Sequence, residues 1–163
     1  MEQKHALLGL IDDRDPSFED VRKSLSYYGF EDIKGAWQNL NALAGEPRLK
    51  EILSGILEPL FDLLSRSPDP DMALRNFFRF SEAALDRSLL FSLLKENPTL
   101  LGLLVHIFGY SQYLSDILVR NPEYFLWIVE AGLKLKGREE LLSELKETVV
   151  GRRTKEGAFN ALR

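Results

Sequence analysis

Apolar residues recur at helical spacing in the segments that lie between prolines and polar clusters. Two such stripes stand out: Leu74, Phe77, Phe78, Ser81 and Leu85; and Tyr110, Tyr113, Leu114, Ile117 and Leu118. Residues at this spacing share one face of a helix, so we expect both stripes to face a core. The 31 leucines outnumber the 16 β-branched residues, which favours helix because unbranched side chains lose less rotamer freedom there.

Short polar residues before prolines mark the expected helix starts. The pairs are Asp15-Pro16, Asp69-Pro70, Asn97-Pro98 and Asn121-Pro122. An Asp or Asn side chain can accept a hydrogen bond from a free amide of the first turn, and proline in that turn lacks only an N–H that would be unpaired. Gly29, Gly45 and Gly109 follow apolar segments and are expected to end helices as left-handed caps.

These signals predict an all-α protein, a multi-helix bundle of nine to ten short helices with no sheet. The expected helices span 3–11, 16–28, 31–44, 47–66, 70–84, 86–96, 98–108, 111–120, 122–131 and 137–150, and another begins at 154. Whether the helix over 47–66 is kinked or broken at Pro59 stays open at this point.

A weak internal repeat has a spacing of 24 residues. Leu93-Leu94 precede Asn97-Pro98, and Ile117-Leu118 precede Asn121-Pro122. A helical solenoid would show more copies at a regular period. Two copies predict two similar helix–turn–helix joints within a bundle.

Composition narrows the class of protein. The chain has 163 residues, of which 45% are apolar, and we expect a single helical domain over 1–163. It lacks cysteine, which excludes disulfides, zinc ribbons and thiol nucleophiles and favours a reducing, cytoplasmic location.

The longest apolar run, Leu100 to Tyr110, is too short to span a bilayer, and the N-terminus has no basic segment typical of a signal peptide. The expected partners therefore exclude membranes.

Charge argues against nucleic acid as a partner. The formal net charge is −4, whereas phosphate neutralisation requires a basic stripe. Residues 134–163 carry +3 and the preceding residues −7. A solvated helix face is the favoured interpretation of the basic end, and an arm for an acidic partner is the alternative.

Two acidic pairs have the Asp-x-Asp spacing that metal-dependent nucleotidyl transfer uses: Asp13 with Asp15, and Asp69 with Asp71. On a β-strand both carboxylates of such a pair would point to the same side and could bind Mg²⁺. Both pairs lie at predicted helix starts and lack a preceding strand with a glycine-rich turn, so capping is the favoured role. The sequence predicts no catalytic, cofactor-binding or metal-binding residue.

The two histidines offer no metal site. His106 has no acidic residue or second histidine three or four positions away, and His5 lies near the N-terminus. We expect His106 to be a hydrogen-bonded histidine in the core or at its rim. Neither a nucleophile elbow nor a phosphate-binding loop is present in the sequence, while a triad assembled only in the fold stays open.

An aromatic cluster is the remaining candidate. Phe77, Phe78 and Phe80 lie among Arg75 and Arg79, an arrangement that could stack on bases, but the chain is acidic. Phe80 points off the predicted core stripe. An exposed Phe80, or an exposed Trp127, would therefore indicate a docking surface.

Three stretches of the chain resemble the N-terminal helical region of glutamine synthetase adenylyltransferases. They are Gly29-Phe30-Glu31-Asp32 with Ala36-Trp37-Gln38-Asn39-Leu40, then Ser67-Pro68-Asp69-Pro70-Asp71-Met72-Ala73-Leu74-Arg75-Asn76-Phe77-Phe78-Arg79-Phe80, then Asn97-Pro98 through Phe108 to Leu114 and Arg120-Asn121-Pro122-Glu123. The similarity covers Gly29 to Glu130, and its most specific part is the joint from Gly109 to Glu123. Asn121 stands where the family often has histidine. Gly157 to Arg163 resembles the start of the helix that leads into the first catalytic domain.

The resemblance implies a large bifunctional enzyme. Such an enzyme uses ATP and Mg²⁺ to attach AMP to a tyrosine of glutamine synthetase and removes it by phosphorolysis, under control of PII-type signal proteins. Its catalytic part carries a glycine-rich turn and an Asp-x-Asp on strands, and neither element occurs here, so no site residue carries over. We therefore expect an N-terminal helical fragment that is catalytically inert alone. Its expected partner is its own catalytic domain, and the face that this domain would cover should be exposed and apolar. The alternative is a free-standing helical scaffold that binds another protein.

Overall fold

The computed structural model describes residues 16–45 and 47–130. Within these residues the chain forms eight α-helices and no strand, which confirms the all-α class. The helices are α2 (Phe18–Tyr27), α3 (Ile33–Leu43), α4 (Pro47–Leu64), α5 (Pro70–Ala83), α6 (Arg87–Glu96), α7 (Pro98–Tyr110), α8 (Gln112–Arg120) and α9 (Glu123–Glu130). Each helix predicted between 16 and 131 is present, and those predicted over 3–11, over 137–150 and from 154 lie outside the described residues.

Contacts divide the chain into two units, 1–126 and 127–163. Of the second unit, only 127–130 belong to the described residues, and Trp127 is exposed there. In the part of the chain that can be described, no one helix has the length and apolar character to cross a membrane. Helices α6 and α7 satisfy both criteria only as a pair, with a bend of 112° between them.

Helix α4 continues through Pro59 without a break. Proline inside a helix removes one backbone hydrogen bond and crowds the preceding turn. The proline ring lies on the exposed side of α4, while the opposite side is buried before and after it. The buried residues are Leu49, Leu53, Ile56, Leu57, Leu60, Phe61 and Leu64. Their packing holds the helix together across the proline.

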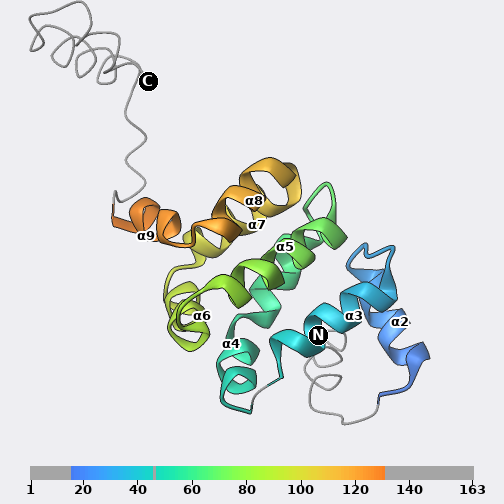
Figure 1. Cartoon of the computed structure of the whole chain (residues 1–163). Coiled ribbons are helices and arrows are strands. Elements are labelled where there is room, and N and C mark those ends of the chain that lie inside the picture. The colour runs from blue at the N-terminus through green and yellow to red at the C-terminus, as the bar shows by residue number, and fades with distance from the viewer. Residues whose placement is uncertain (1–15, 46, 131–163) are drawn as a thin grey trace, which may run out of the picture. The chain divides into compact units, whose positions relative to one another are not determined.

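Helix α5 is the central element of the first unit, with packing contacts to α3, α7 and α8 (Figure 1). An aromatic chain runs through this core. Phe77 stacks on Phe91 of α6 with ring centroids 6.2 Å apart, and it also contacts Phe108 of α7. Phe80 contacts Phe108 and Phe125, each at 5.6 Å. Aromatic pairs in these geometries add to the stabilisation from burial itself.

The expectation that Phe80 lies off the core is therefore wrong, because its side chain is only 1% exposed. A single stripe describes a helix that is covered on one side. Helix α5 is covered on several sides, and Phe108 with Phe125 fills the sector that sequence periodicity assigned to solvent. Phe80 provides no docking surface.

Both predicted stripes include residues that do not face the core. Leu85 lies beyond the end of α5 and is fully exposed. On α8 only Ser115 and Leu118 are buried, whereas Tyr113 and Leu114 are exposed. The second stripe fails because Tyr110 belongs to α7 and the helical period restarts after Ser111.

The three glycines expected to end helices behave differently. Gly29 has a φ of 86° and follows α2, as predicted for a left-handed cap. Gly45 has the same place after α3, directly beyond the cap residue Ala44, but it does not have a positive φ, so the left-handed cap predicted there is wrong. Gly109 lies within α7 and is buried. The reason for a glycine at 109 is therefore close packing rather than helix termination.

The two asparagine joints share one geometry, which confirms the internal repeat. In each joint the asparagine donates two hydrogen bonds to the carbonyl four residues earlier, one from its backbone N–H and one from its side-chain amide. Asn97 donates both to Leu93, and Asn121 donates both to Ile117, all at 3.0 Å. Asn97 therefore caps the end of α6, and its side chain makes no cap bond to α7, contrary to the predicted start signal.

The aspartate start signals have two outcomes. Asp69 caps α5 as predicted, with its carboxylate accepting from the Met72 N–H at 2.8 Å. Helix α2 is capped by Ser17 rather than by the predicted Asp15, which lies outside the described residues. Aspartate has no donor, so it can serve only a helix start, whereas the asparagine amide can also serve a helix end.

Candidate functional site

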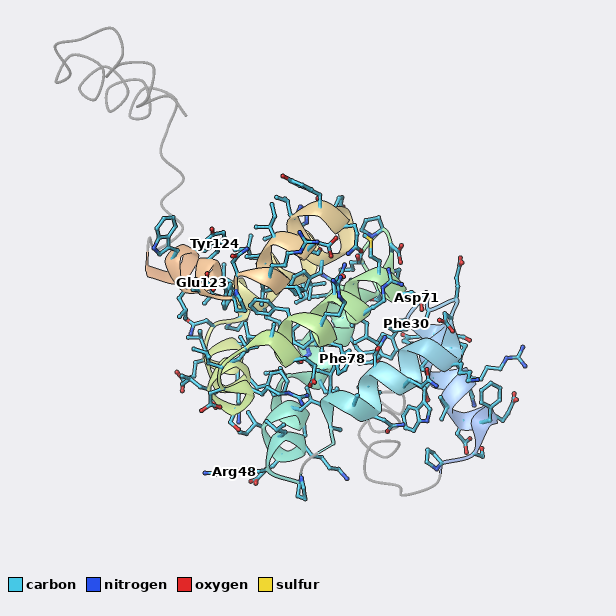
Figure 2. All side chains as sticks on the ribbon, in the orientation of Figure 1. Phe30, Arg48, Asp71, Phe78, Glu123 and Tyr124 are labelled. Atoms are coloured by element: carbon cyan, nitrogen blue, oxygen red, sulfur yellow. The ribbon has the colours of Figure 1, made fainter. Side chains whose placement is uncertain are left out.

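The acidic pair Asp69 and Asp71 holds two helices in place. Asp69 caps its own helix, and Asp71 accepts hydrogen bonds from the backbone N–H groups of Glu31 at 2.8 Å and Asp32 at 3.2 Å. Those amides belong to the turn that begins α3, beside Phe30 (Figure 2). The capping role is confirmed for this pair. Asp69 caps its own helix α5, and Asp71 caps the start of α3, about forty residues earlier in the chain. Asp13 and Asp15 lie outside the described residues.

Replacing Asp71 by alanine is expected to destabilise the domain by about 1–2 kcal/mol, because two amide donors at the start of α3 lose a charged acceptor. Equilibrium urea unfolding followed by circular dichroism would measure the change. Asp62→Ala is the matched control, since Asp62 is exposed on α4 and its substitution should change stability by less than about 0.5 kcal/mol. Equal effects of the two substitutions would contradict the capping role.

The acidic pair Asp69 and Asp71 does not form a Mg²⁺ site. Among them there is no group of three or more histidine, aspartate or glutamate side chains that could hold a metal ion. The Asp69 and Asp71 carboxylates are each occupied by backbone amides of different helices. A nucleotidyl-transfer centre needs clustered oxygen ligands, so this pair supplies none of its chemistry.

Arg87 secures the other end of α3. Its guanidinium donates to the carbonyls of Ala42 at 3.2 Å and Leu43 at 3.3 Å, and it pairs with Glu82 at 2.6 Å. These carbonyls lie at the C-terminus of α3, where the helix dipole favours a cation. Both ends of α3 are thus held by side chains that come from α5 and α6.

Four side chains join α5 to α8, and we call them the α5–α8 polar network: Asn76, Arg79, Gln112 and Asp116. Asn76 is completely buried and exchanges two amide hydrogen bonds with Gln112, at 3.1 and 3.2 Å. Asn76 also donates to the Phe108 carbonyl at 3.2 Å, which satisfies a free carbonyl at the end of α7. The network therefore fixes the corner between α7 and α8 on α5.

The charged half of the network lies at its exposed side. Arg79 donates to Asp116 at 2.8 Å and to Asn76 at 3.0 Å, and Gln112 donates to Asp116 at 2.9 Å. The hydrogen bonds from Arg79 and then from Gln112 lower the pKa of Asp116 below its ordinary value, and the nearby charges of Arg79 and Arg120 act in the same direction. Partial burial opposes them and is outweighed.

The lowered pKa of Asp116 predicts a stability contribution that depends on pH. A carboxyl whose pKa is lower in the folded state contributes fully above its unfolded pKa, close to 3.8, and loses this contribution as the pH falls through the folded pKa. We expect Asp116→Asn to be less stable than the parent at pH 7 and the difference to shrink below about pH 4. Urea unfolding of both proteins between pH 3 and 7 tests this. A difference that is constant across the range would contradict the role of the charge.

The remaining candidates are separated by the fold. His106 is exposed on α7 and stacks on Tyr110, with ring centroids 4.2 Å apart, so the expected hydrogen-bonded position in the core or at its rim is wrong. Phe77 is buried and Phe78 is half-buried. Arg79 belongs to the polar network, and Arg75 is exposed one turn earlier on α5. The base-stacking cluster considered from the sequence is not formed.

Sequence reasoning missed the polar network and the exposed aromatic corner beside it. Asn76 could have been found as a polar residue that shares its helix face with the apolar residues Ala73 and Phe80, three positions before it and four after it. Tyr110 and Tyr113 are 61% and 75% exposed at the corner between α7 and α8. The sequence assigned both to a core stripe.

The class of protein follows from these observations. The described residues form a helical domain in which the notable polar side chains tie helix ends together and in which aromatic residues are exposed at one corner.

Curated proteins similar to the chain are bifunctional glutamine synthetase adenylyltransferase/adenylyl-removing enzymes. The protein from Mycobacterium marinum is 35% identical over 106 residues, which are 64% of this chain and 11% of that protein. Those from Corynebacterium efficiens and Corynebacterium glutamicum are 32% identical over 109 residues and 28% over 148, covering 66% and 88% of this chain and 10% and 14% of the relatives. No family model and no solved structure matches.

The similarity of these proteins to the chain confirms the resemblance to glutamine synthetase adenylyltransferases found in its sequence. The chain spans about a tenth of the length of the curated relatives it matches.

Proposed function

We propose that this chain is the N-terminal helical part of an enzyme of the glutamine synthetase adenylyltransferase type and that it orients or regulates the catalytic domain. The observation that carries the proposal is the identity of 35% over 106 residues to a relative with that name. In this proposal the parent enzyme transfers AMP from ATP, with Mg²⁺, to a tyrosine of glutamine synthetase and removes it by phosphorolysis. Regulation by a PII-type protein and a cytoplasmic location belong to the same proposal.

The proposal includes that the chain alone is catalytically inert. The use of Asp69 and Asp71 in helix capping supports this part, since the acidic pair is engaged in holding the fold. The chemistry then belongs to a catalytic domain elsewhere in the parent polypeptide, and the helical part provides a rigid body against which that domain is placed.

An AMP-transfer assay tests this directly. The purified chain is incubated with radiolabelled ATP, Mg²⁺ and glutamine synthetase, after circular dichroism has shown that it is folded. We expect no labelled glutamine synthetase, whereas the parent enzyme should label it under the same conditions. Transfer by the chain alone would overturn the inert assignment.

A free-standing scaffold that binds another protein is the second candidate. The exposed Tyr110 and Tyr113 favour it, because paired exposed aromatic residues are common in protein interfaces. Reading the gene beyond Arg163 separates the two candidates. Continuation into a glycine-rich turn followed by Asp-x-Asp supports the parent enzyme, and a stop codon directly after Arg163 supports the scaffold.

A further inference from the structure

Charged side chains from outside α3 hold this helix at both ends. Asp71, near the start of α5, accepts hydrogen bonds from two backbone N–H groups in the turn that begins α3, at 2.8 and 3.2 Å. Arg87, the first residue of α6, donates to two carbonyls in the last turn of α3, at 3.2 and 3.3 Å. The carboxylate thus lies at the positive end of the helix dipole and the guanidinium at the negative end. We call these contacts the Asp71 clamp and the Arg87 clamp.

Helix α3 is weak by itself. It has eleven residues, with no acidic residue in its first turn and no basic residue in its last. Its first turn instead carries Lys34, which the positive end of the dipole disfavours. Gly35, Asn39 and Asn41 have low helix propensity, and a helix shorter than about 12–15 residues is marginal in isolation. The stability of α3 therefore depends on its docking and on the two clamps.

Helix α2 depends in turn on α3. It packs on α3, which itself packs on α5 (Figure 1). The buried side of α2 holds Val21 and Leu25. The turn between the two helices places Tyr28 and Phe30 against Phe61 of α4, with ring centroids 5.1 and 5.7 Å from that of Phe61. Because α3 carries α2, the two helices should detach together.

The rest of the first unit has a core of its own. The aromatic chain described above lies on α5, α6, α7 and α9. The α5–α8 polar network joins α5 to the corner between α7 and α8. Both sets of contacts remain when α2 and α3 detach. A segment that can leave without disrupting the main core is the kind that opens locally, below the free energy of global unfolding.

One atom of the Arg87 clamp favours opening. Arg87 Nε is buried and has no hydrogen-bond partner within the part of the chain that the structure describes. A buried donor without an acceptor costs free energy because it has lost its hydrogen bond to water. Withdrawal of α3, whose carbonyls bind the same guanidinium, gives water access to this group. Part of the cost of opening is therefore offset.

We propose that α2 and α3 form a latch, which opens from α4 and α5 as one unit while α4 to α8 stay folded. The open state uncovers Phe61, and the two clamps set how rarely that state is populated. The latch is independent of the proposed function, because it follows from contacts within the fold.

Native-state hydrogen exchange of the whole chain tests the proposal, in the regime where closing is faster than chemical exchange. After correction for intrinsic rates, the hydrogen-bonded amides of α2 and α3 should exchange at least about tenfold faster than those of α5 and α7. Low concentrations of urea should accelerate exchange in α2 and α3 less than in α5 and α7, because opening of the latch exposes less surface than global unfolding.

Substitutions on the two sides of the latch should act differently. Asp71→Ala removes one clamp and should accelerate exchange in α2 and α3 by about 5- to 30-fold. Asp62→Ala, at an exposed position of α4, is the matched control and should change it by less than about twofold.

Leu118→Ala is the complementary variant, since Leu118 is buried on α8, which stays packed when the latch opens. It should accelerate exchange in α5 and α7 by at least about 30-fold and leave exchange in α2 and α3 within about twofold of the parent. If Leu118→Ala does not fold, Gln112→Ala is a milder change on the same helix and should show the same selectivity.

Three results would overturn the proposal. Equal exchange and equal urea dependence in α2, α3, α5 and α7 would mean that the domain opens only as a whole. Unchanged exchange of α2 and α3 in Asp71→Ala would mean that the clamp does not hold the latch. An equal effect of the α8 substitution on α2, α3, α5 and α7 would mean that the latch does not open separately.

Discussion

Gly109→Ala is expected to destabilise the domain by about 1–3 kcal/mol, although alanine is the better helix former by about 1 kcal/mol. A methyl group at position 109 would overlap the Ser67 hydroxyl and lie 3.1 Å from Ser67 Cβ and 3.4 Å from Ala73 Cβ. Helix α7 thus passes the start of α5 and the turn before it too closely for a side chain. Equilibrium unfolding in urea, followed by circular dichroism, measures the loss.

Gly102→Ala is the matched control in the same helix. A methyl group there meets only Leu63 Cδ2 at 3.9 Å, which is an ordinary contact, so the helix preference of alanine should dominate. We expect Gly102→Ala to raise stability by up to about 1 kcal/mol. The two substitutions should therefore have opposite signs, and a stabilising Gly109→Ala would show that α7 does not approach Ser67 as described.

Asn76→Ala is expected to destabilise the domain by about 2–4 kcal/mol. The substitution removes the Asn76 donor from the buried Phe108 carbonyl and from Gln112 Oε1, and each unpaired buried group costs about 1–3 kcal/mol. Urea unfolding is again the measurement. Asn41→Ala, at an exposed position of α3, is the control and should change stability by less than about 0.5 kcal/mol.

A double-mutant cycle separates the network from the effect of a smaller side chain. If Asn76 and Gln112 act as one unit, then Gln112→Ala should cost much less in the Asn76→Ala background than in the parent. Additive effects of the two substitutions would mean that the paired amides contribute independently, and the proposed network would be wrong.

Helix positions could be predicted from the sequence because their signals are local. Asp69 and Pro70 mark the start of α5 through contacts within one turn. The same pattern at Asn97 predicts a cap for the start of α7, but the Asn97 side chain caps the end of α6. An asparagine amide can bond to either helix end, and the pattern does not say which. The local pattern thus predicts the boundary between α6 and α7 correctly, but it does not predict which helix end the asparagine side chain bonds to.

The orientation of each helix could not be predicted with equal success because it depends on neighbours distant in sequence. Phe80 is buried since α7 and Phe125 cover it, and Tyr113 is exposed since α8 faces α5 with Gln112 and Asp116. The partner of Asp71 lies about forty residues earlier, beyond the reach of any spacing rule. Family resemblance located the region, and the fold was needed to show what its polar residues do.

The joint at Asn97 has a mechanical consequence. Glu96 ends α6 and Pro98 begins α7, so a single residue carries the chain through the bend. One inserted residue would rotate all of α7 by roughly 100° about its axis. That rotation would turn Leu101 and Leu104 away from the interior. Length at this joint is therefore as constrained as side-chain identity, and foreign peptides or protease sites should be placed elsewhere in the chain.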